Sequence, residues 1–469
     1  MNPRELSSEK MKNEGINSYV INNFLHMLDK VERGHRGLTR EKDIEPVQEL
    51  TKYEDLKKYK ETGLKNLNKL VFGKLNGGLG TGMGLEKAKS LLEVKPNLTI
   101  IDGFFEQLII FNKKYNVKIP LLLMNSFNTD EDTKKYIKKY PEVKTISFVQ
   151  NKHPKIFTDT LHPAEHKYNH LEWNPPGHGD IYLAMMQTGI LDKLLNDGFK
   201  YLFMSNGDNL GAVIDPYVFG YVIEKKIPFL MEAVDRTPSD TKGGHLAKYK
   251  KNNQLLLREI AQCHEDDKEH FQDITRHKYF NANLLWINLV VLKKLLKKHD
   301  NILPMPMLVN EKNVNPKDKT SKKVYQIETA MGSAIELFNG AEAIVTPKKR
   351  FAPIKKCSNL LEIWSDIYVI NDMKQLVISE KRTLPPIYIE LDDKYYQIYN
   401  DFKERFNEVP SLINCNTLKV NGDVKFGKGV VLKGNVVIIN ESGKQHLLES
   451  IVIENKTIKI DKNGEIKSS

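Results

Sequence analysis

Short apolar runs alternate with segments of helical hydrophobic spacing between residues 70 and 366. The runs predict buried strands at residues 70–72, 120–124, 145–148, 201–205 and 228–234. Apolar positions repeated at three and four residues predict helices at residues 102–115, 131–139, 179–195 and 291–298. Because strands and helices alternate along the chain, the pattern predicts an α/β domain with a largely parallel sheet.

The two ends of the chain have different patterns. Near the N-terminus, apolar side chains recur with helical spacing from Ile16 to Val31 and predict an amphipathic helix that packs on the main domain. After Pro385 and Pro386, apolar pairs such as Val424/Phe426 recur every six residues, with glycines at the turns. That period predicts a short β-helix of stacked coils, and a plain β-meander is the alternative.

These patterns divide the chain into an N-terminal helical segment (residues 1–65), a central domain (residues 66–380) and a C-terminal β-helix domain (residues 381–469). A length of 469 residues is sufficient for about two or three domains. The sequence has no apolar run of the roughly 18 residues that cross a bilayer and no apolar signal core at its N-terminus, so we expect a cytoplasmic protein without a membrane partner.

Charge and cysteine usage narrow the class of protein. The net charge is +11, from 71 Lys+Arg against 60 Asp+Glu, but the lysines form short scattered groups rather than one stripe, which argues against nucleic-acid binding. The three cysteines are far apart in the sequence. This spacing argues against a disulfide framework and against a cysteine-rich zinc site.

A glycine-rich stretch directly follows the first predicted strand. Five glycines occur within eight residues, from Gly77 to Gly84, and Lys87 and Lys89 come next. Glycines allow the main chain to approach a ligand closely, and free N–H groups near a helix start favour an anion, so the stretch predicts a phosphate site. It matches neither the Walker loop nor the dinucleotide-binding fingerprint, because Met83 and Ala88 stand where those motifs need glycine.

Polar clusters begin where two other predicted strands end. Residues 125–132 follow one strand and residues 206–209 follow another. In open α/β sheets the ligands lie at the carboxyl ends of the strands. We therefore expect both clusters to share one edge of the sheet with the glycine stretch.

Eight sequence blocks together resemble the eukaryotic-type UTP glucose-1-phosphate uridylyltransferases, the UDP-glucose pyrophosphorylases, in the order of that family and over nearly the whole chain. The blocks are LNGGLGTGMG, LLLMNSFNTDEDT, NPPGHGDIY, SNGDNLGAVID, KGGHL, FNANLLWINL, QIETAMGSAI and RFAPIKKCSNLLEIWSDIY. The resemblance implies a Rossmann-like, glycosyltransferase-A-like nucleotidyltransferase core with a mixed sheet in the central domain. It also implies a left-handed β-helix at the C-terminus.

The resemblance implies a nucleotide site made by residues from three of these blocks and by Gln150, which lies in the separate segment FVQNKHPKI. The implied nucleotide-binding residues are Leu75, Asn76, Gly77, Gly78, Gln150, Gly177, Asn206, Gly207 and Asp208. Asp208 is also the implied ligand of Mg²⁺, a hard ion suited to oxygen ligands and phosphates.

The resemblance also implies a sugar site and two catalytic lysines. His178 is expected at the sugar phosphate, and Gly244, Glu259 and Asn283 at the glucose hydroxyls. Lys89 is expected on the phosphates of UTP, and Lys355 on the reacting α-phosphate, although the neighbouring Lys356 is an alternative for that role.

The implied reaction converts UTP and α-D-glucose 1-phosphate into UDP-glucose and diphosphate by direct in-line, Mg²⁺-dependent uridylyl transfer. Nucleotidyl transfer needs positioned cations and aligned reactants rather than a covalent nucleophile. A UDP-N-acetylhexosamine or broad-specificity UDP-sugar pyrophosphorylase is one alternative, and a non-catalytic nucleotide-sensing or RNA-binding protein is another. A homo-oligomer through the C-terminal domain stays open.

Three single residues have structural alternatives. His178 is either a phosphate ligand or a structural histidine in its turn, and Asp208 is either a metal ligand or the cap of a following helix. Glu232, which ends an apolar run, is either a core carboxylate or a sugar ligand. The sequence alone does not decide between these interpretations.

Overall fold

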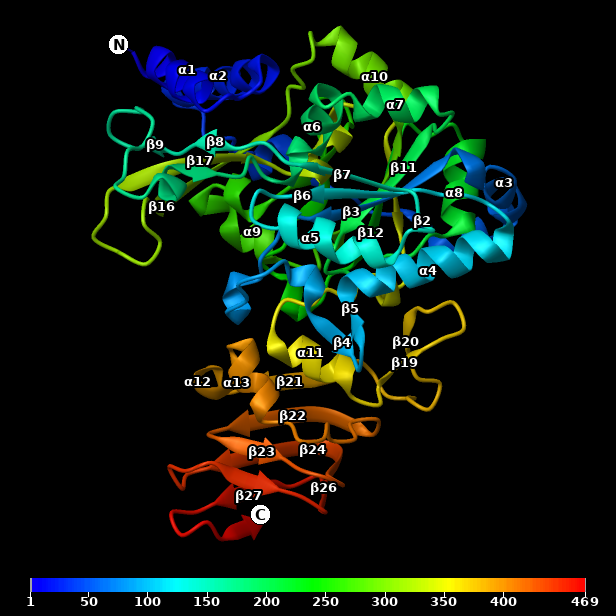
Figure 1. The fold of residues 1–469 in the computed structure, drawn as a ribbon, viewed down its shortest axis with the longest axis vertical. Helices are drawn as coiled ribbons and strands as arrows, with labels where there is room; N and C mark the ends of the chain where they lie inside the picture. Colours follow the sequence, from blue (N-terminus) through cyan, green and yellow to red (C-terminus); the bar gives the residue numbers. More distant parts are fainter. Residues whose placement is uncertain (1, 469) are drawn as a thin grey trace.

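A large mixed sheet forms the centre of the molecule in the computed structural model, which describes residues 2–468. Its strand order is β2-β18-β12-β15-β11-β3-β6-β7 (Figure 1). The bounds are β2 (Thr51–Lys52), β3 (Leu70–Asn76), β6 (Leu121–Asn125), β7 (Thr145–Val149), β11 (Tyr201–Asn206), β12 (Phe229–Asp235), β15 (Tyr279–Asn288) and β18 (Glu342–Val345). Each of the five strands predicted from the apolar runs lies in this sheet.

Strand β15 is the exception to the parallel arrangement. It pairs antiparallel with both β11 and β12, whereas the other neighbouring strands along this path pair in parallel. The mixed sheet is therefore confirmed. A smaller antiparallel extension, β13 (His245–Tyr249) with β14 (Leu255–Arg258), joins the sheet beside β15.

The two faces of the sheet are covered by different helices. Neighbouring residues such as Val71 and Phe72 point to opposite faces, as strand geometry requires, and belong to separate apolar clusters. The cluster of Phe72 includes side chains of α4 (Ile100–Tyr115), α8 (Pro216–Glu224) and α11 (Cys357–Trp364). The cluster of Val71 includes α6 (Ile181–Gln187), α7 (Ile190–Asn196) and α10 (Leu289–Lys298).

Helices are found in all four predicted segments, but one segment predicted as a single helix is two helices. The segment predicted as one helix over residues 179–195 is two helices, α6 and α7, because the chain turns at Thr188 and Gly189, where Gly189 has φ +73°. The segment predicted over residues 131–139 is α5 (Asp130–Tyr136) followed by one 3₁₀ turn. In residues 2–468 no helix has the length and apolar content required to cross a membrane.

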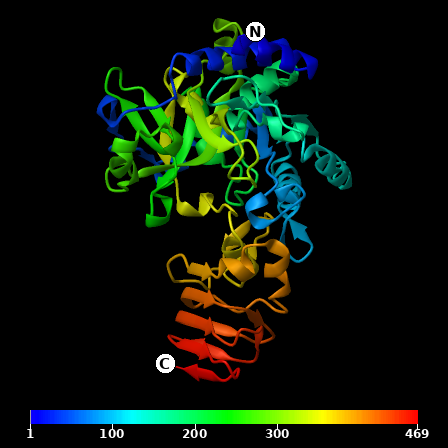
Figure 2. The ribbon, with the colours of Figure 1, turned by 90° about the vertical axis from the view of Figure 1, so that its left-hand side faces the viewer.

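The first 65 residues are not only helical. Helices α1 (Pro3–Asn13) and α2 (Ser18–Glu32) pack on one end of the molecule, where Val20, Phe24 and Leu28 are buried (Figures 1 and 2). Further along, β1 (Ile44–Pro46) pairs with β13, and β2 forms an edge of the central sheet. These two short strands were not predicted, since two or three residues leave no periodic signal.

The C-terminal part is a stack of short strands that extends away from the sheet (Figure 2). The stack contains β21 (Tyr388–Leu391), β22 (Cys415–Asn421), β23 (Val424–Phe426), β24 (Val431–Asn440), β25 (His446–Leu448), β26 (Val452–Glu454) and β27 (Thr457–Ile460). Successive coils pair in parallel, β22 with β24 and β24 with β27. The parallel pairing excludes the β-meander, and the apolar pairs with a period of six form the buried interior.

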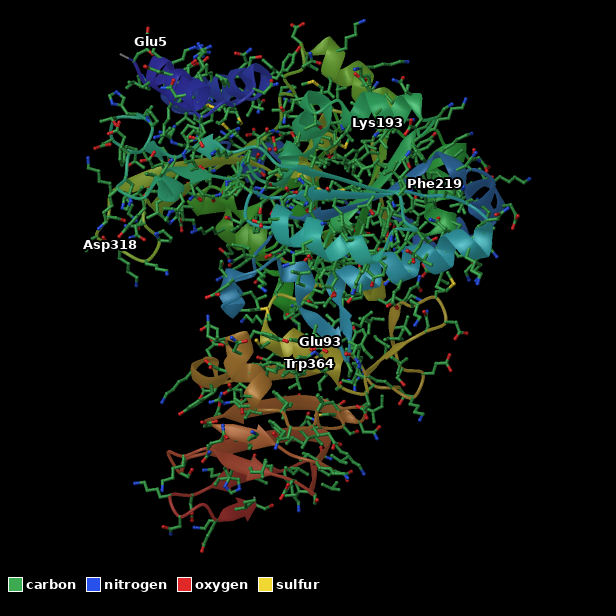
Figure 3. The ribbon with its side chains drawn as sticks, in the orientation of Figure 1. Glu5, Glu93, Lys193, Phe219, Asp318 and Trp364 are labelled. Atoms are coloured by element: carbon green, nitrogen blue, oxygen red, sulfur yellow. The ribbon has the colours of Figure 1, made fainter. Side chains whose placement is uncertain are left out.

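The last strand reverses this pattern. Strand β28 (Ile466–Ser468) pairs antiparallel with β27 at the far end of the stack. At the near end, the stack is tied to the rest of the molecule through α11 and β4 (Glu93–Lys95). There the indole N–H of Trp364 donates to the carbonyl of Glu93 at 3.1 Å, as the two labels in Figure 3 locate.

Candidate active site

A cleft lies at the carboxyl ends of β3, β6 and β11. Its lining contains each residue that was predicted to bind the nucleotide, together with Lys89 and His178. The parallel register explains the clustering, because Leu75 is opposite Asn206 and Asn76 is opposite Asn125. The expectation that the two polar clusters and the glycine stretch share one edge of the sheet is confirmed.

The glycine stretch is a tight loop rather than the start of an α-helix. Gly80 and Gly84 have φ of +73° and +69°, a left-handed conformation that glycine adopts readily. The loop contains two short 3₁₀ turns, and the amide of Lys89 closes it by donating to the carbonyl of Gly78 at 2.9 Å. The predicted helix start is therefore absent here, and α4 begins at Ile100.

Side chains that follow β6 support the floor of the cleft. The hydroxyl of Thr129 donates to the carbonyl of Asn76 at 2.7 Å, and the hydroxyl of Ser126 donates to the carbonyl of Gly77 at 2.8 Å. The amide of Asn76 donates to Asn125 and Thr133, both at 2.8 Å. These bonds occupy carbonyl groups of the loop, so that the buried loop backbone is satisfied while its glycines stay beside the cleft.

Lys89 and Asp208 meet across the cleft. The Lys89 Nζ lies 2.7 Å from Asp208 Oδ2, and both side chains are partly exposed. Between Asn206 and Asp208 a side chain is excluded, because a Cβ at Gly207 would lie 2.3 Å from the carbonyl oxygen of Leu75. Glycine at position 207 thus lets the segment that carries Asp208 approach β3.

His178 has a defined proton position. Its Nδ1 accepts a hydrogen bond from the amide of Met331 at 2.9 Å, so the ring proton of the neutral imidazole is on Nε2. Loss of hydration lowers the pKa of His178 to about 4, which keeps the ring neutral at physiological pH. The structural interpretation is therefore confirmed, because Nδ1 binds the backbone. The ring also lines the cleft, and its role as a phosphate ligand stays a prediction.

Gln150 is placed beside the glycine loop by its neighbours. The backbone N–H of Gln150 donates to the backbone carbonyl of Asn125 at 2.8 Å, which extends the pairing of β7 with β6 by one residue. Asn151 donates its backbone N–H and its side-chain amide to the carboxylate of Asp180, at 2.7 and 2.8 Å. Asp180 thus fixes the loop of Gln150 against the turn that carries Gly177 and His178.

The three residues predicted at the glucose hydroxyls, Gly244, Glu259 and Asn283, form a second group that is not part of the cleft lining. The carboxylate of Glu259 lies so close to Gly244 that a Cβ there would be 2.6 Å from it. Asn283 has φ +50° at an irregularity between β12 and β15, and its Oδ1 accepts a bond from Asn281 at 2.8 Å. Non-glycine residues held in this conformation often occur at functional sites.

A short 3₁₀ segment (Met331–Glu336) connects the two groups. Its first residue donates to His178, and the next, Gly332, approaches Asn281, whose amide nitrogen would be 3.0 Å from a Cβ at Gly332.

Burial raises the pKa of Glu259 to about 7, and the nearby positive charge of Lys355 opposes that shift. Lys355 is therefore on the side of the sugar group.

Lys355 is joined to Asp208 through the main chain. The amide of Ile354 donates to the carbonyl of Asp208 at 3.0 Å. Lys355 and Lys356 are both exposed, and both their amides donate to the Asn359 side chain at 3.0 Å. Neither lysine lines the cleft, so the choice of Lys355 over Lys356 stays a prediction.

Comparison with known proteins decides the family. A family model described as UTP–glucose-1-phosphate uridylyltransferase matches residues 21–433. The chain belongs to this family. Among its relatives, the uridylyltransferase 2 of Dictyostelium discoideum is 38% identical over 421 residues, 88% of this chain and 82% of the relative. The uridylyltransferase of Musa acuminata is 41% identical over 405 residues, 85% of this chain and 84% of the relative.

Solved structures agree with this assignment. A mutant UDP-glucose pyrophosphorylase from Leishmania major, in complex with UDP-glucose, superposes with a TM-score of 0.90 at 40% identity, covering 98% of this chain and 99% of that one. A protein from Trypanosoma brucei described as UDP-glucose phosphorylase gives a TM-score of 0.89 at 42% identity, covering 98% and 100%. The family's fold thus extends over nearly all of this chain.

Two alternatives for single residues of this family member are now resolved. The carboxylate of Glu232 is fully buried and accepts bonds from Arg350 and from the indole of Trp286, at 2.7 and 2.9 Å, so it is a core carboxylate. Asp208 does not cap a helix, because the next helix, α8, begins at Pro216 with Asp215 as its cap.

Three cleft residues escaped the sequence analysis: Ser90, Met124 and Pro175. In residues 2–468 the buried hydroxyl of Ser90 is among the few side-chain groups without a hydrogen-bond partner, which suits a ligand contact. Met124 and Pro175 lie inside blocks that the analysis named, and Ser90 directly follows Lys89. Position within or beside the named residues was therefore the available signal.

A cluster of metal ligands is not present within residues 2–468. Asp208 is the sole carboxylate in the cleft lining that the structure describes. Mg²⁺ in nucleotide enzymes is usually held by one or two carboxylates together with phosphate oxygens and waters. One carboxylate beside the glycine loop therefore fits an ion whose other ligands would come from phosphate and water.

Proposed function

We propose that this chain catalyses the reversible reaction of UTP with α-D-glucose 1-phosphate to give UDP-glucose and diphosphate. The observation that carries the proposal is the cleft itself, which unites the glycine loop, Lys89, Asp208 and His178 at one edge of the sheet. The family match and the relatives named for this reaction support the same activity.

The main-chain groups of Leu75 to Gly78 hold the uridine, and Lys89 lies on the phosphates of UTP. The neutral His178 donates its Nε2 proton to the sugar phosphate, since Nδ1 is already occupied by Met331. A neutral donor orients the phosphate oxygen without forming a tight ion pair. That oxygen can then attack the α-phosphorus of UTP in line with the departing diphosphate.

Lys355 is the second cation of the proposal and meets the α-phosphate from the side of the sugar group. The glucose hydroxyls exchange hydrogen bonds with Gly244, Glu259 and Asn283. The left-handed turn at Asn283 and the closeness of Glu259 to Gly244 support this role. The two lysines thus neutralise the phosphate charge from two directions, which is the main requirement of this chemistry.

Mg²⁺ is the proposed cofactor, with Asp208 as its protein ligand. When bound, the ion neutralises phosphate charge and orients the departing diphosphate. Lys89 Nζ lies 2.7 Å from Asp208 Oδ2, so the lysine that would meet the phosphates is beside the carboxylate that would hold the ion.

We also propose four finer features of the chain. The C-terminal stack is a β-helix, which the parallel pairing of β22, β24 and β27 and of β23 with β25 supports. Its left-handed sense is proposed from the family resemblance alone. The domain division at residues 65 and 380 and a cytoplasmic location are retained as proposals, and so is a homo-oligomer through the C-terminal domain.

The test of function is a diphosphate-release assay over a panel of substrates. UTP with glucose 1-phosphate is expected to give the highest kcat/KM, and ATP, CTP and GTP are expected to be poor replacements. Higher kcat/KM with N-acetylglucosamine 1-phosphate, or equal values over several sugars, would favour the other pyrophosphorylase classes. Absence of diphosphate release with salt-sensitive RNA binding would overturn the enzyme proposal.

A further inference from the structure

Asn209 is buried directly beside Asp208, with 1% of its surface exposed, and its side chain bridges two distant segments. Its amide nitrogen donates to the carbonyl of Arg350 at 3.1 Å. Its amide oxygen accepts from the backbone N–H of Ala352 at 2.9 Å and of Gly211 at 3.1 Å. One side chain therefore binds both the segment that carries Asp208 and the segment that leads to Lys355.

The main chain continues the bridge in register. Asn209 and Pro353 form an antiparallel β-bridge. On either side of it, the backbone N–H of Leu210 donates to the carbonyl of Ala352 at 3.2 Å. The backbone N–H of Ile354 donates to the carbonyl of Asp208 at 3.0 Å. The approach is so close that a Cβ at Gly211 would lie 2.3 Å from the carbonyl oxygen of Lys349. The relative position of Asp208 and Lys355 thus depends on this contact.

Both sides of the bridge are anchored to the sheet. The guanidinium of Arg350 binds the carboxylate of Glu232 on β12, with one contact at 2.7 Å. On the other side, the buried Lys74 of β3 donates to the carbonyl of Ala212 at 2.8 Å. Because the anchors are rigid strands, the hydrogen bonds of Asn209 set the gap between them rather than following a mobile loop.

We propose that Asn209 is a positioning residue for uridylyl transfer, which fixes the carboxylate of Asp208 relative to the ammonium of Lys355. The inference rests on the proposed function. Asn209 does not touch the reactants, since it is 1% exposed and is not part of the cleft lining. Its contribution is to hold two reacting charges in one geometry, and displacements of about 1 Å reduce enzyme rates by up to about 100-fold.

The test is a double-mutant cycle of Asn209→Ala with Lys355→Ala. Asn209→Ala is expected to lower kcat by about 30- to 100-fold, with the KM values for UTP and glucose 1-phosphate changed by less than about threefold. In the Lys355→Ala background the same substitution is expected to lower kcat by less than about threefold, because the group that it positions is gone.

Asn112→Ala is the matched control. Asn112 makes a similar pair of bonds, donating to the carbonyl of Ile119 at 3.1 Å and accepting from its amide at 3.0 Å, near the end of α4 and before β6 begins. This variant is expected to lose thermal stability without a loss of kcat beyond about twofold. Asn209→Asp keeps the acceptor and loses the donor, so it is expected to have an intermediate kcat.

Three results would overturn the inference. One is a folded Asn209→Ala enzyme with unchanged kcat, and another is an equal fractional loss in both backgrounds, which would indicate a general defect. If Asn209→Ala does not fold, Asn209→Asp takes its place in the cycle with the same criteria. The third result is an inactive wild-type enzyme, which would overturn the proposed function as well. With an active wild-type enzyme, failure of the cycle counts against the role of Asn209 alone.

Discussion

Lys89 Nζ lies 2.7 Å from Asp208 Oδ2, so the glycine loop and the end of β11 are joined by one ion pair at the centre of the cleft. Lys89 follows the tight turns of the loop, and Asp208 follows a glycine that lets its segment approach β3. Phosphate and a divalent cation can each replace one member of the pair. The pair therefore places the lysine predicted to meet the phosphates beside the carboxylate predicted to bind the metal.

The first prediction concerns the metal role of Asp208. In Asp208→Ala, the Mg²⁺ concentration that gives half-maximal diphosphate release is expected to rise by about tenfold or more, because the cleft loses its carboxylate ligand. A Mg²⁺ titration at saturating substrates measures this. Asp197→Ala, which removes a surface ion pair with Lys144, is the control and is expected to leave the titration unchanged. An unaltered midpoint in Asp208→Ala would remove Asp208 from the metal site.

The second prediction concerns the neutral state of His178. Because loss of hydration lowers its pKa to about 4, the ring carries no charge between pH 5.5 and 8, and its contribution is expected to be constant over this range. His178→Leu is expected to reduce kcat/KM for glucose 1-phosphate by about 10- to 100-fold, the range for a lost hydrogen bond to a charged group. His178→Gln is expected to retain part of the activity.

NMR titration of the His178 ring provides a direct check. A ring pKa below about 5, with the proton of the neutral form on Nε2, is the expected result. A ring pKa close to the ordinary value of about 6.5 would contradict the neutral-donor role.

The third prediction concerns Glu259 and pH. Burial raises its pKa to about 7, so the carboxylate becomes protonated as the pH falls from 8 to 6 and accepts hydrogen bonds less strongly. The KM for glucose 1-phosphate is expected to rise over this range, by about fivefold from the difference between charged and neutral hydrogen bonds. Steady-state kinetics at several pH values measure the change.

Glu259→Gln serves as the comparison, because the phosphate of the substrate also titrates, near pH 6. The variant retains the titration of the substrate and loses that of the protein. Its KM is expected to be higher at pH 8 and to depend less on pH than that of the wild-type enzyme. Identical pH dependence in both proteins would show that Glu259 does not titrate in this range.

The fourth prediction concerns Lys74, which is buried under the cleft with 1% exposure. Its ammonium donates to the hydroxyl of Ser205 at 2.9 Å and to the carbonyl of Ala212, and burial lowers its pKa to about 7. Between this pKa and the ordinary value near 10.4, the unfolded chain binds more protons than the folded one, so this lysine makes stability rise with pH. The destabilisation is fully present below pH 7.

Urea unfolding of wild type and Lys74→Met at pH 6 and pH 9 tests this. The free energy of unfolding of the wild type, minus that of the variant, is expected to increase by about 2–3 kcal/mol from pH 6 to pH 9. Lys134→Met, which removes an exposed lysine, is the control and is expected to give a difference close to zero. A pH-independent difference for Lys74→Met would mean that its pKa is not lowered.

The sequence predicted much of the central sheet, because buried parallel strands are short apolar runs that need no partner to be recognised. It could not predict that β15 runs against its neighbours, since strand direction depends on the path of the chain between strands. The break between α6 and α7 was also missed. Apolar periodicity continues through Thr188 and Gly189, although the backbone turns there.

The predicted site likewise contains residues that strand positions could place and residues that they could not. Most of the residues predicted for the nucleotide follow or end strands of the central sheet, so the sheet brings them together, and the structure confirms their clustering in the cleft. Gly177 comes instead from the turn before α6. Gly244, Glu259 and Asn283 meet through the β13–β14 extension and an irregular strand, which only the family resemblance could indicate. Ser126 and Thr129 bind carbonyl groups of the glycine loop, and their pattern does not reveal this contact.

The antiparallel strand β28 at the end of the C-terminal stack restricts how copies of this chain can join there. Two copies that paired antiparallel through the outer edges of β28 would be related by a two-fold axis, so this mode of association would close at a dimer.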